Sequence, residues 1–255
     1  MRGLKDRVVL VVGGAGGIGT ATCVRLAEEG AAVVVADLNP GAAAQVATAI
    51  RDGGGTAEST TVDLRDEESV KAAVDLTVER FGGLDALHAN GADTSPETVG
   101  LDSDVESVPL DVFDRTIAAN LRGHLLCARY AIPKLLDRGG GSLVFTSSAA
   151  AFVGEAERPS YAISKSGLGG LIRHIASRWG KAGIRANGVA PGVVLTEAVR
   201  SALDPTFRDL TLAATRSARL GTPEDVAALV AFLASEDGSW INGQIISVDG
   251  GWLLR

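Results

Sequence analysis

Short apolar runs alternate along the chain with longer stretches in which apolar residues recur at helical spacing. Seven runs rich in Val, Ile and Leu predict strands, which cover 8–12, 32–37, 57–64, 84–89, 142–147, 185–191 and 244–248. The stretches between them predict helices near 18–29, 41–52, 66–81, 111–137, 160–180 and 223–235. Strands that are apolar throughout and separated by helices indicate a parallel sheet covered on both faces. The pattern therefore predicts a doubly wound α/β fold. No internal repeat or linker interrupts it, so we expect residues 1–255 to form a single domain.

The composition argues against several classes of function. Acidic residues outnumber basic ones by 31 to 24, the net charge is −7, and no basic run is present, so we expect no binding to nucleic acid or anionic membrane. No apolar stretch is long enough to span a bilayer, and the N-terminus lacks a signal-peptide pattern, which predicts a cytoplasmic protein. We expect Cys23 and Cys127 to be buried, reduced thiols in helices. His88, His124 and His174 are scattered without metal-ligand spacing, so we expect no metal.

The glycine-rich turn "VVGGAGGIG" follows the first predicted strand and opens the first predicted helix. Its glycines fit G-x-x-x-G-x-G through Gly13, Gly17 and Gly19, or the dinucleotide fingerprint G-x-G-x-x-G through Gly14, Gly16 and Gly19. Both arrangements let bare backbone approach a pyrophosphate at a helix N-terminus, where free N–H groups and the helix dipole attract anions. A tight turn without a ligand would use similar glycines, so the strand before it and the helix after it strengthen the assignment.

The stretch "SYAISK" has Tyr161 four positions before Lys165 in a predicted helix. Positions i and i+4 of a helix lie on one face, so the phenol and the ammonium would be neighbours. Ser148 ends the strand "SLVFTSS", and Asn120 lies inside the preceding predicted helix. Each residue alone could serve packing, solvation or a local hydrogen bond, and only the combination indicates a catalytic site.

A glycine-rich loop followed by Asn, Ser and Tyr-x-x-x-Lys, in this order, resembles the short-chain dehydrogenase/reductase family, which has a Rossmann-like fold. The similarity runs from about residue 5 to 251. It includes "IRANGVAPGVVLT" (184–196), similar to the family's Asn-x-x-x-Pro-Gly-x-x-x-Thr stretch, and "INGQIISVDGG" (241–251), similar to its last strand and turn. The resemblance implies a cofactor half at about 1–140 and a catalytic and substrate half at about 141–255.

Hydride transfer from a secondary alcohol to a nicotinamide requires a base that takes the hydroxyl proton. A free tyrosine has a pKa of about 10, but a lysine ammonium one turn away favours the phenolate. We therefore expect Tyr161 to be the acid/base and Lys165 to lower its pKa. We expect Ser148 to hold and polarise the substrate oxygen. By resemblance, Lys165 also bonds the nicotinamide ribose, and Asn120 supports a water chain that carries the proton to solvent.

Asp37 ends the second predicted strand, 18 positions after Gly19, where an acidic residue can accept hydrogen bonds from a ribose 2′-hydroxyl. We expect NAD rather than NADP, because a 2′-phosphate would face this carboxylate. The places where NADP-preferring relatives usually have a cation hold Gly16, Leu38 and Asn39. The alternative is that Asp37 merely caps the next helix. The expected cofactor contacts are Gly13, Gly16, Gly17, Ile18, Gly19, Asp37, Leu38, Asp63, Leu64, Asn90, Gly91, Tyr161, Lys165, Pro191, Gly192, Val194 and Thr196.

Two departures from the family's pattern concern neighbouring loops. Val12 stands where the glycine loop usually begins with Thr, and Ala89-Asn90-Gly91-Ala92 replaces the usual Asn-Asn-Ala-Gly. In the family, that Thr and the first Asn help to tie these loops together. The substitutions leave the reacting groups untouched but predict altered loop packing.

The expected substrate contacts follow the fifth and sixth strands or belong to a lid predicted between 196 and 218. They are Ser148, Ala150, Phe152, Tyr161, Val193, Leu203 and Phe207. This mostly apolar set suits a hydrophobic secondary alcohol or ketone, such as a cyclic or steroid-like compound. The alternatives are a 3-oxoacyl thioester reductase, for which no basic docking face is visible, and a non-catalytic dinucleotide-sensing scaffold, which would not need a proton relay.

The stretch from 93 to 114 has seven carboxylates and no Lys or Arg. We interpret it as a solvated surface loop. A flap that disfavours anionic substrates is the alternative. The helix that carries Tyr161 also has small residues, including Gly169 and Gly170, beside apolar ones. Close packing between copies, together with the resemblance, predicts a homotetramer.

Overall fold

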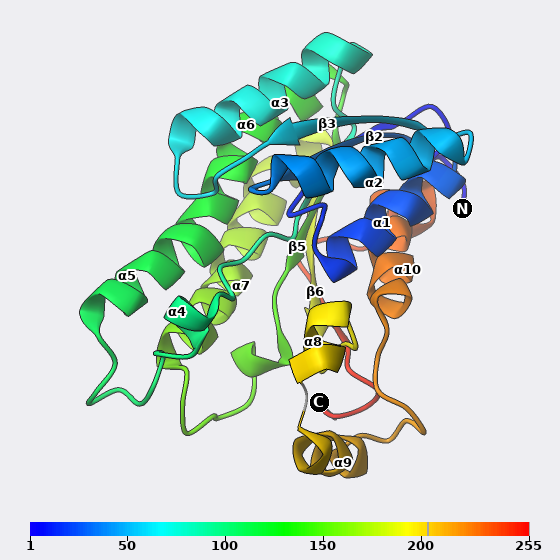
Figure 1. Cartoon of the computed structure of the whole chain (residues 1–255). Coiled ribbons are helices and arrows are strands. Elements are labelled where there is room, and N and C mark those ends of the chain that lie inside the picture. The colour runs from blue at the N-terminus through cyan, green and yellow to red at the C-terminus, as the bar shows by residue number, and fades with distance from the viewer. Residues whose placement is uncertain (203, 255) are drawn as a thin grey trace.

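The structure, a computed structural model, describes residues 1–202 and 204–254. In this part of the chain seven strands form one parallel sheet in the order β3-β2-β1-β4-β5-β6-β7 (Figure 1). The strands are β1 (Val8–Val12), β2 (Ala32–Asp37), β3 (Thr56–Thr61), β4 (Ala86–Ala89), β5 (Gly141–Thr146), β6 (Ile184–Pro191) and β7 (Ile245–Val248). The predicted doubly wound α/β fold is confirmed. The strand order reverses between β1 and β4, where ligands of such folds bind.

Helices cover both faces of the sheet (Figure 1). One layer consists of α1 (Gly17–Glu28), α2 (Pro40–Asp52) and α10 (Pro223–Ala234). The other consists of α3 (Glu67–Phe81), α6 (Gly123–Asp137) and α7 (Pro159–Trp179). None of these or the other described helices combines the length and the apolar character needed to span a bilayer.

Strand β1 explains why the central runs of the sequence are apolar without alternation. Leu10 and Val12 pack under α3 and α6, whereas Val9 and Val11 pack under α1 and α2. Because successive side chains of a strand point to opposite faces, a sheet covered on both sides needs apolar residues at every position.

The predicted helix over 111–137 is interrupted. The chain forms α5 (Leu110–Ile117), then a π-helical turn at Ala118–Arg122, and then α6. Hydrophobic spacing did not reveal this turn, because a π-helical turn inserts a single residue, and one shift of phase is hard to detect within a long stretch of helical spacing.

Three short helices were not predicted: α4 (Pro96–Val99), α8 (Glu197–Ala202) and α9 (Pro205–Ala214). In Figure 1 they lie below the sheet, on the side where the strands end. The helices α8 and α9 occupy the segment predicted as a lid, and α4 belongs to the acidic stretch. All three stand beside the edge at which ligands bind.

Candidate active site

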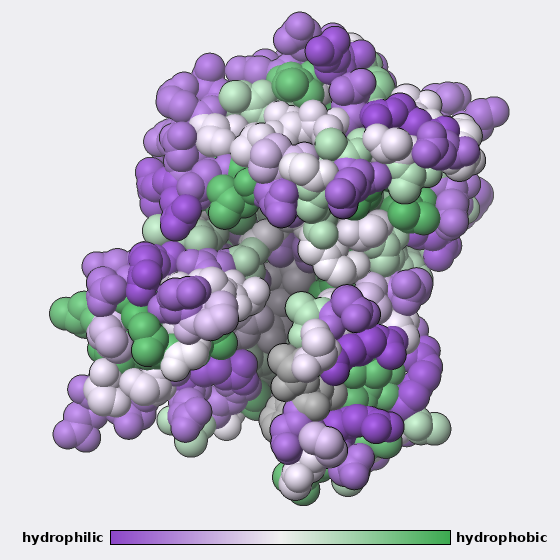
Figure 2. Space-filling view, viewed as in Figure 1, coloured by the Kyte–Doolittle hydropathy of each residue, from purple (hydrophilic) through white to green (hydrophobic). Residues whose placement is uncertain are grey.

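A cleft of about 1020 Å³ opens at the carboxyl edge of the sheet. Figure 2 shows it as a deep hollow between the region of α4 and α5 and the region of α8 and α9. Most residues predicted to bind cofactor or substrate line it: Gly13, Gly16, Gly17, Ile18, Asp37, Leu38, Asp63, Leu64, Asn90, Gly91, Ser148, Ala150, Tyr161, Lys165, Pro191, Gly192, Val193, Val194 and Thr196. Residues from the two halves of the sequence therefore share one cavity.

Three predicted site residues do not line the cleft. Gly19 packs inside the turn, where a Cβ would collide with the carbonyl oxygen of Gly13. Phe152, predicted to touch substrate, follows a short 3-10 turn and has 38% of its surface exposed. Asn120 is buried beneath the cleft. Leu203 lies outside the described residues, as does the side chain of Phe207.

The glycine loop has the features of an anion cradle. Gly13 adopts a φ of 77°, and a side chain there would strike the backbone of Gly91. The N-terminus of α1, at Gly16, has no side-chain cap, so its first N–H groups point toward the cleft without a competing side chain. A pyrophosphate needs close backbone approach and free N–H donors, and the residues present fit that group.

Asp37 lies at the end of β2 and faces the glycine loop. Its Oδ2 accepts a hydrogen bond from the Ala15 N–H over 2.9 Å, and its Oδ1 accepts one from the Asn39 N–H over 3.0 Å. Helix α2 is capped by Asn39, whose Oδ1 accepts from the Ala42 N–H over 3.0 Å. The alternative in which Asp37 serves only as the helix cap is therefore wrong.

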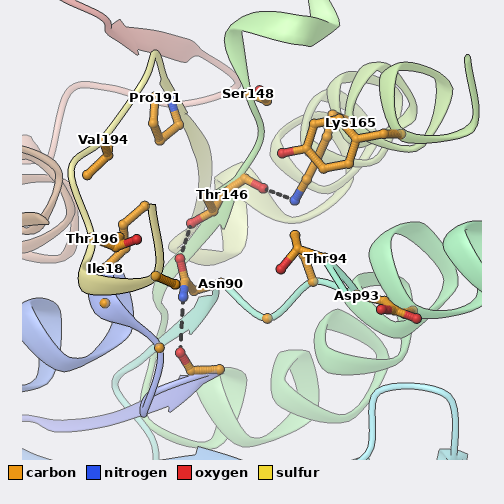
Figure 3. A pocket seen from close by; sticks show the side chains of 18 of the residues that line it. Ile18, Asn90, Asp93, Thr94, Thr146, Ser148, Lys165, Pro191, Val194 and Thr196 are labelled. Carbon is orange, nitrogen blue, oxygen red and sulfur yellow. Dashed lines mark hydrogen bonds between the residues drawn. The ribbon is translucent and has the colours of Figure 1, made fainter. Parts of the chain in front are cut away.

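Lys165 is 1% exposed on α7, and its Nζ donates a hydrogen bond to the Thr146 carbonyl oxygen over 2.8 Å (Figure 3). The same Nζ lies 5.8 Å from the centroid of the Tyr161 ring. Ser148, just beyond β5, is half-buried, and its hydroxyl is near enough to the Tyr161 phenol to lower the pKa of that phenol. The turn of α7 and the end of β5 thus bring Ser148, Tyr161 and Lys165 together at one wall of the cleft.

The phenol of Tyr161 has a raised pKa, which differs from the sequence-based expectation. Burial raises it, the hydrogen bond with Ser148 and the charge of Arg158 lower it, and the charge of Glu155 raises it. Burial also lowers the pKa of Lys165 to about 8. The Lys165 ammonium faces a carbonyl oxygen, and burial disfavours its charge. In the free protein, therefore, Lys165 does not bring the pKa of the Tyr161 phenol below its ordinary value.

Asn120 lies in the π-helical turn Ala118–Arg122 and is 0% exposed. Its Oδ1 accepts a hydrogen bond from the Asp93 N–H over 2.7 Å, whereas its Nδ2 has no partner among the described residues. Such turns often occur at functional sites, and a buried amide with a free donor requires a further acceptor.

No cluster of possible metal ligands occurs among the described residues. His88 and His124 are buried and belong to no such cluster. Burial lowers the pKa of each ring to about 3, and the charge of Lys165 contributes to this shift. Cys23 and Cys127 are buried free thiols in α1 and α6.

Comparisons with known proteins give the family. The family model described as enoyl-(acyl carrier protein) reductase matches residues 13–253. A relative from Bradyrhizobium diazoefficiens, named as a probable short-chain type dehydrogenase/reductase, is 39% identical over 98% of this chain and 89% of its own length. This chain belongs to the short-chain dehydrogenase/reductase family. The predicted family is confirmed.

Two further members of the short-chain dehydrogenase/reductase family have named substrates. Cis-4-hydroxycyclohexanecarboxylate dehydrogenase of Sinomonas cyclohexanicum is 40% identical over 97% of this chain and 96% of its own length. The structure of a 7α-hydroxysteroid dehydrogenase in complex with NADH and 7-oxo-glycochenodeoxycholic acid is 32% identical, with a TM-score of 0.89. The match covers 97% of this chain and 95% of that one.

The two departures from the family's loop pattern are met by other contacts. Val12 and Ala89 are buried, and the Val12 carbonyl oxygen accepts backbone hydrogen bonds from Asn90 and Gly91. The Asn90 amide donates to the Gly13 carbonyl oxygen over 3.0 Å (Figure 3). The glycine loop and the loop after β4 are therefore tied together without the usual Thr and first Asn.

This tie continues into β5 and β4. The Thr146 hydroxyl donates to Asn90 Oδ1 over 2.9 Å, and His88 Nε2 lies 2.8 Å from the same hydroxyl oxygen. Since the hydroxyl proton points to Asn90, His88 Nε2 is the donor, which sets the ring as the neutral Nε2–H tautomer. The Thr146 carbonyl holds Lys165, so one residue joins the loop after β4 to Lys165.

Sequence reasoning missed several residues that line the cleft. Arg158 and Glu155 lie beside Tyr161, and Trp252 comes from the C-terminal segment. Arg65 also lines it and pairs with Asp63 over 2.8 Å. Arg158 stands directly before α7 and three positions from Tyr161, and this nearness in sequence is the one signal that could have suggested it. Trp252 and Arg65 carry no such local signal.

Proposed function

We propose that this protein is an NAD-dependent oxidoreductase that transfers a hydride between NAD(H) and a hydrophobic secondary alcohol or ketone. The observation that carries the proposal is the meeting of Ser148, Tyr161 and Lys165 at one wall of a cleft that the glycine loop also lines. A proton-transfer group beside a dinucleotide cradle is what alcohol oxidation requires.

Tyr161 takes the hydroxyl proton in oxidation and returns it in reduction. Ser148, whose hydroxyl lowers the pKa of the phenol, orients the substrate oxygen and favours the phenolate. Lys165, held by the Thr146 carbonyl, supplies a positive charge and an N–H donor toward a ribose. Asn120, whose Nδ2 has no partner within the described part of the chain, is suited to bind a water that passes the proton toward solvent.

The cofactor contacts proposed are those predicted from the sequence, except that Gly19 acts by packing. The glycine loop would hold the pyrophosphate, Asp37 the adenosine ribose, and Lys165 the nicotinamide ribose. When bound, the nicotinamide supplies the hydride acceptor or donor. NAD is favoured over NADP because Asp37 would repel a 2′-phosphate, and the named relative with a bound cofactor holds NADH.

The substrate proposed is a cyclic or steroid-like alcohol or ketone. The walls of the cleft include the apolar residues Ala149, Ala150, Val193, Val199 and Trp252. The named relatives act on a hydroxylated cyclohexane ring and a steroid, which supports this choice. A 3-oxoacyl thioester reductase is the second candidate, because the matched family model is described by an acyl-carrier-protein reductase.

We propose further that the chain acts as a cytoplasmic homotetramer built from single-domain subunits, each with its cofactor half at about 1–140 and its catalytic half at about 141–255. Ile163 on α7 is 49% exposed and Trp240 is 97% exposed, surfaces that a second copy of the chain could bury. Light scattering should give a particle of about four times the 26.1 kDa chain mass, and a 26.1 kDa particle would refute the assembly.

NADH absorbance tests the function. The purified protein is incubated with NAD and secondary alcohols, or with NADH and ketones, over a panel of cyclic, steroid and 3-oxoacyl thioester compounds. Turnover of cyclic or steroid compounds is expected. Preference for the thioester would select the second candidate, and binding of NADH without turnover of any compound would indicate a sensing scaffold.

A further inference from the structure

One cation beside Tyr161 has no assigned role as acid, base or hydrogen-bond donor in the proposed proton transfer. Among the described residues, three cationic side chains line the cleft: Arg65, Arg158 and Lys165. Arg65 is held by both carboxylate oxygens of Asp63, over 3.0 and 2.8 Å, and Lys165 is buried against a carbonyl. Arg158 remains, with its side chain 41% exposed.

The backbone fixes Arg158 at this position. Its φ is 66°, the left-handed region that side-chain-bearing residues rarely adopt. Two carbonyl oxygens accept from its N–H, that of Asp102 over 2.9 Å and that of Ser103 over 2.8 Å. The guanidinium carbon consequently lies 5.8 Å from the centroid of the Tyr161 ring. A substrate group bound to Arg158 would therefore lie close to Tyr161, beside which the reacting carbon of the same substrate is expected.

The guanidinium is only partly engaged. Within the described part of the chain, its single hydrogen-bonding partner is Glu155, whose Oε2 accepts from Nη2 over 2.7 Å. Glu155 also lines the cleft and is 18% exposed. An arginine has five N–H donors arranged for two-point binding of a carboxylate, so most of them stay available. The Glu155 carboxylate already accepts a hydrogen bond from this guanidinium, and a carboxylate on the substrate would bind it in the same way.

We propose that Arg158 binds a carboxylate on the substrate, so that the preferred substrates are hydrophobic secondary alcohols or ketones with an anionic group remote from the reacting carbon. This inference rests on the proposed function and names its substrate class. Glu155 keeps the guanidinium in place when the cleft is empty and opposes the incoming charge. Apolar walls hold the ring, and the charge-assisted bonds to Arg158 fix its orientation.

Calorimetry on the NADH-bound protein tests this without turnover. The probes are cyclohexanecarboxylate and the neutral cyclohexanecarboxamide, which differ chiefly in charge. The wild type should bind the carboxylate about 10-fold more tightly or better, the scale of a charge-assisted hydrogen bond. Arg158→Gln should abolish this difference, and Glu155→Gln should enlarge it by removing a like charge. Equal binding of the two probes by the wild type would overturn the proposal.

The matched control is Arg129→Gln. Arg129 pairs with Glu67 over 3.1 Å on the surface and does not line the cleft, so the preference should persist. Kinetic measurements distinguish a failure of the Arg158 assignment from a failure of the proposed oxidoreductase activity. Turnover of 4-hydroxycyclohexanecarboxylate no faster than of its methyl ester would overturn the role of Arg158 and leave the oxidoreductase intact. Carboxylate-selective binding with no turnover of any compound would overturn the oxidoreductase alone.

Discussion

The carboxylate of Asp102 accepts a hydrogen bond from the backbone N–H of Tyr161 over 2.9 Å. Its other oxygen accepts from the Ser160 N–H over 3.1 Å, and Asp102 is 3% exposed. The residue at the N-cap position of α7, Arg158, makes no side-chain cap, so the helix that carries Tyr161 and Lys165 is capped by a distant loop. The interpretation of the acidic stretch as a solvated loop is wrong at this residue.

Asp102→Ala should destabilise the protein and slow it. The first turn of α7 would lose both side-chain acceptors, and loss of a helix cap costs about 1–2 kcal/mol. For a chain of this length that corresponds to a melting temperature lower by roughly 2–8 °C. Because Tyr161 belongs to this turn, kcat should fall while the Kd for NADH changes little.

The control for this prediction comes from the same loop. Among the described residues, the side chain of Asp104 accepts hydrogen bonds only from its neighbours Glu106 and Ser107, and it is exposed. Asp104→Ala should leave kcat unchanged. Asp102→Asn, which retains one acceptor oxygen, should fall between Asp102→Ala and the wild type. Equal kcat for Asp102→Ala and Asp104→Ala would show that the cap does not position Tyr161.

Tyr161→Phe should reduce turnover by at least ~100-fold, the usual scale of general acid/base catalysis. Removing only the hydroxyl leaves the ring and the cleft intact, so NADH should still bind. Fluorescence titration with NADH and steady-state rates measure the two quantities. A mutant that turns over like the wild type would remove Tyr161 from the mechanism.

The pH profile of alcohol oxidation should move when the charges beside the phenol change. Burial raises the pKa of Tyr161, Arg158 lowers it, and Glu155 raises it. Oxidation uses the phenolate, so kcat/KM rises with pH through this pKa. Arg158→Gln should shift the rising limb to higher pH, and Glu155→Gln should shift it to lower pH. Shifts in the same direction, or none, would contradict the assignment; a neutral alcohol is the substrate, so that binding of charge is not involved.

Lys165→Met should inactivate the enzyme and stabilise its fold. Burial lowers the pKa of Lys165 from 10.5 to about 8. Between these values the unfolded chain binds more protons, so stability rises with pH across that window, and at pH 7 the buried ammonium carries its full penalty. Allowing for the lost bond to Thr146, we expect a gain on the order of 1–3 kcal/mol. Thermal melts at pH 7 measure it, with exposed Lys181→Met as the unchanged control.

The parts of the site that sequence reasoning predicted are those with short-range spacing. Tyr161 and Lys165 stand one helical turn apart, and the glycines of the first turn leave an uncapped helix N-terminus beside the cleft. Strand β1 was predicted to the residue because all five of its positions are apolar. These features depend on local geometry, which a sequence carries directly.

The parts that were missed depend on contacts between distant segments. Asp102 reaches Tyr161 across 59 positions, and no spacing rule links a loop carboxylate to that helix. The lowered pKa of Lys165 comes from its burial, which is a property of the packed fold and not of the i, i+4 pair. The tie through Asn90 and Thr146 spans 56 positions, so it could not be anticipated from the missing Thr and Asn.

Asp37→Ala should weaken the preference for NAD over NADP. In the free protein the carboxylate holds the Ala15 N–H at the glycine loop and the Asn39 N–H, and a bound ribose would be a further partner. Removing it deletes a charge-assisted bond to the 2′-hydroxyl and a repulsion against a 2′-phosphate, together a few kcal/mol, or about 100-fold in specificity. The ratio of kcat/KM for NAD to that for NADP measures this preference, and adding Leu38→Arg to the Asp37→Ala chain should move the ratio further toward NADP.

Asn39→Ala is the matched control, because it removes the cap of α2 and leaves Asp37 in place. It should lower the melting temperature without moving the ratio. If Asn39→Ala shifted the ratio as much as Asp37→Ala, or if the wild type already used both cofactors equally, the ribose assignment of Asp37 would be wrong.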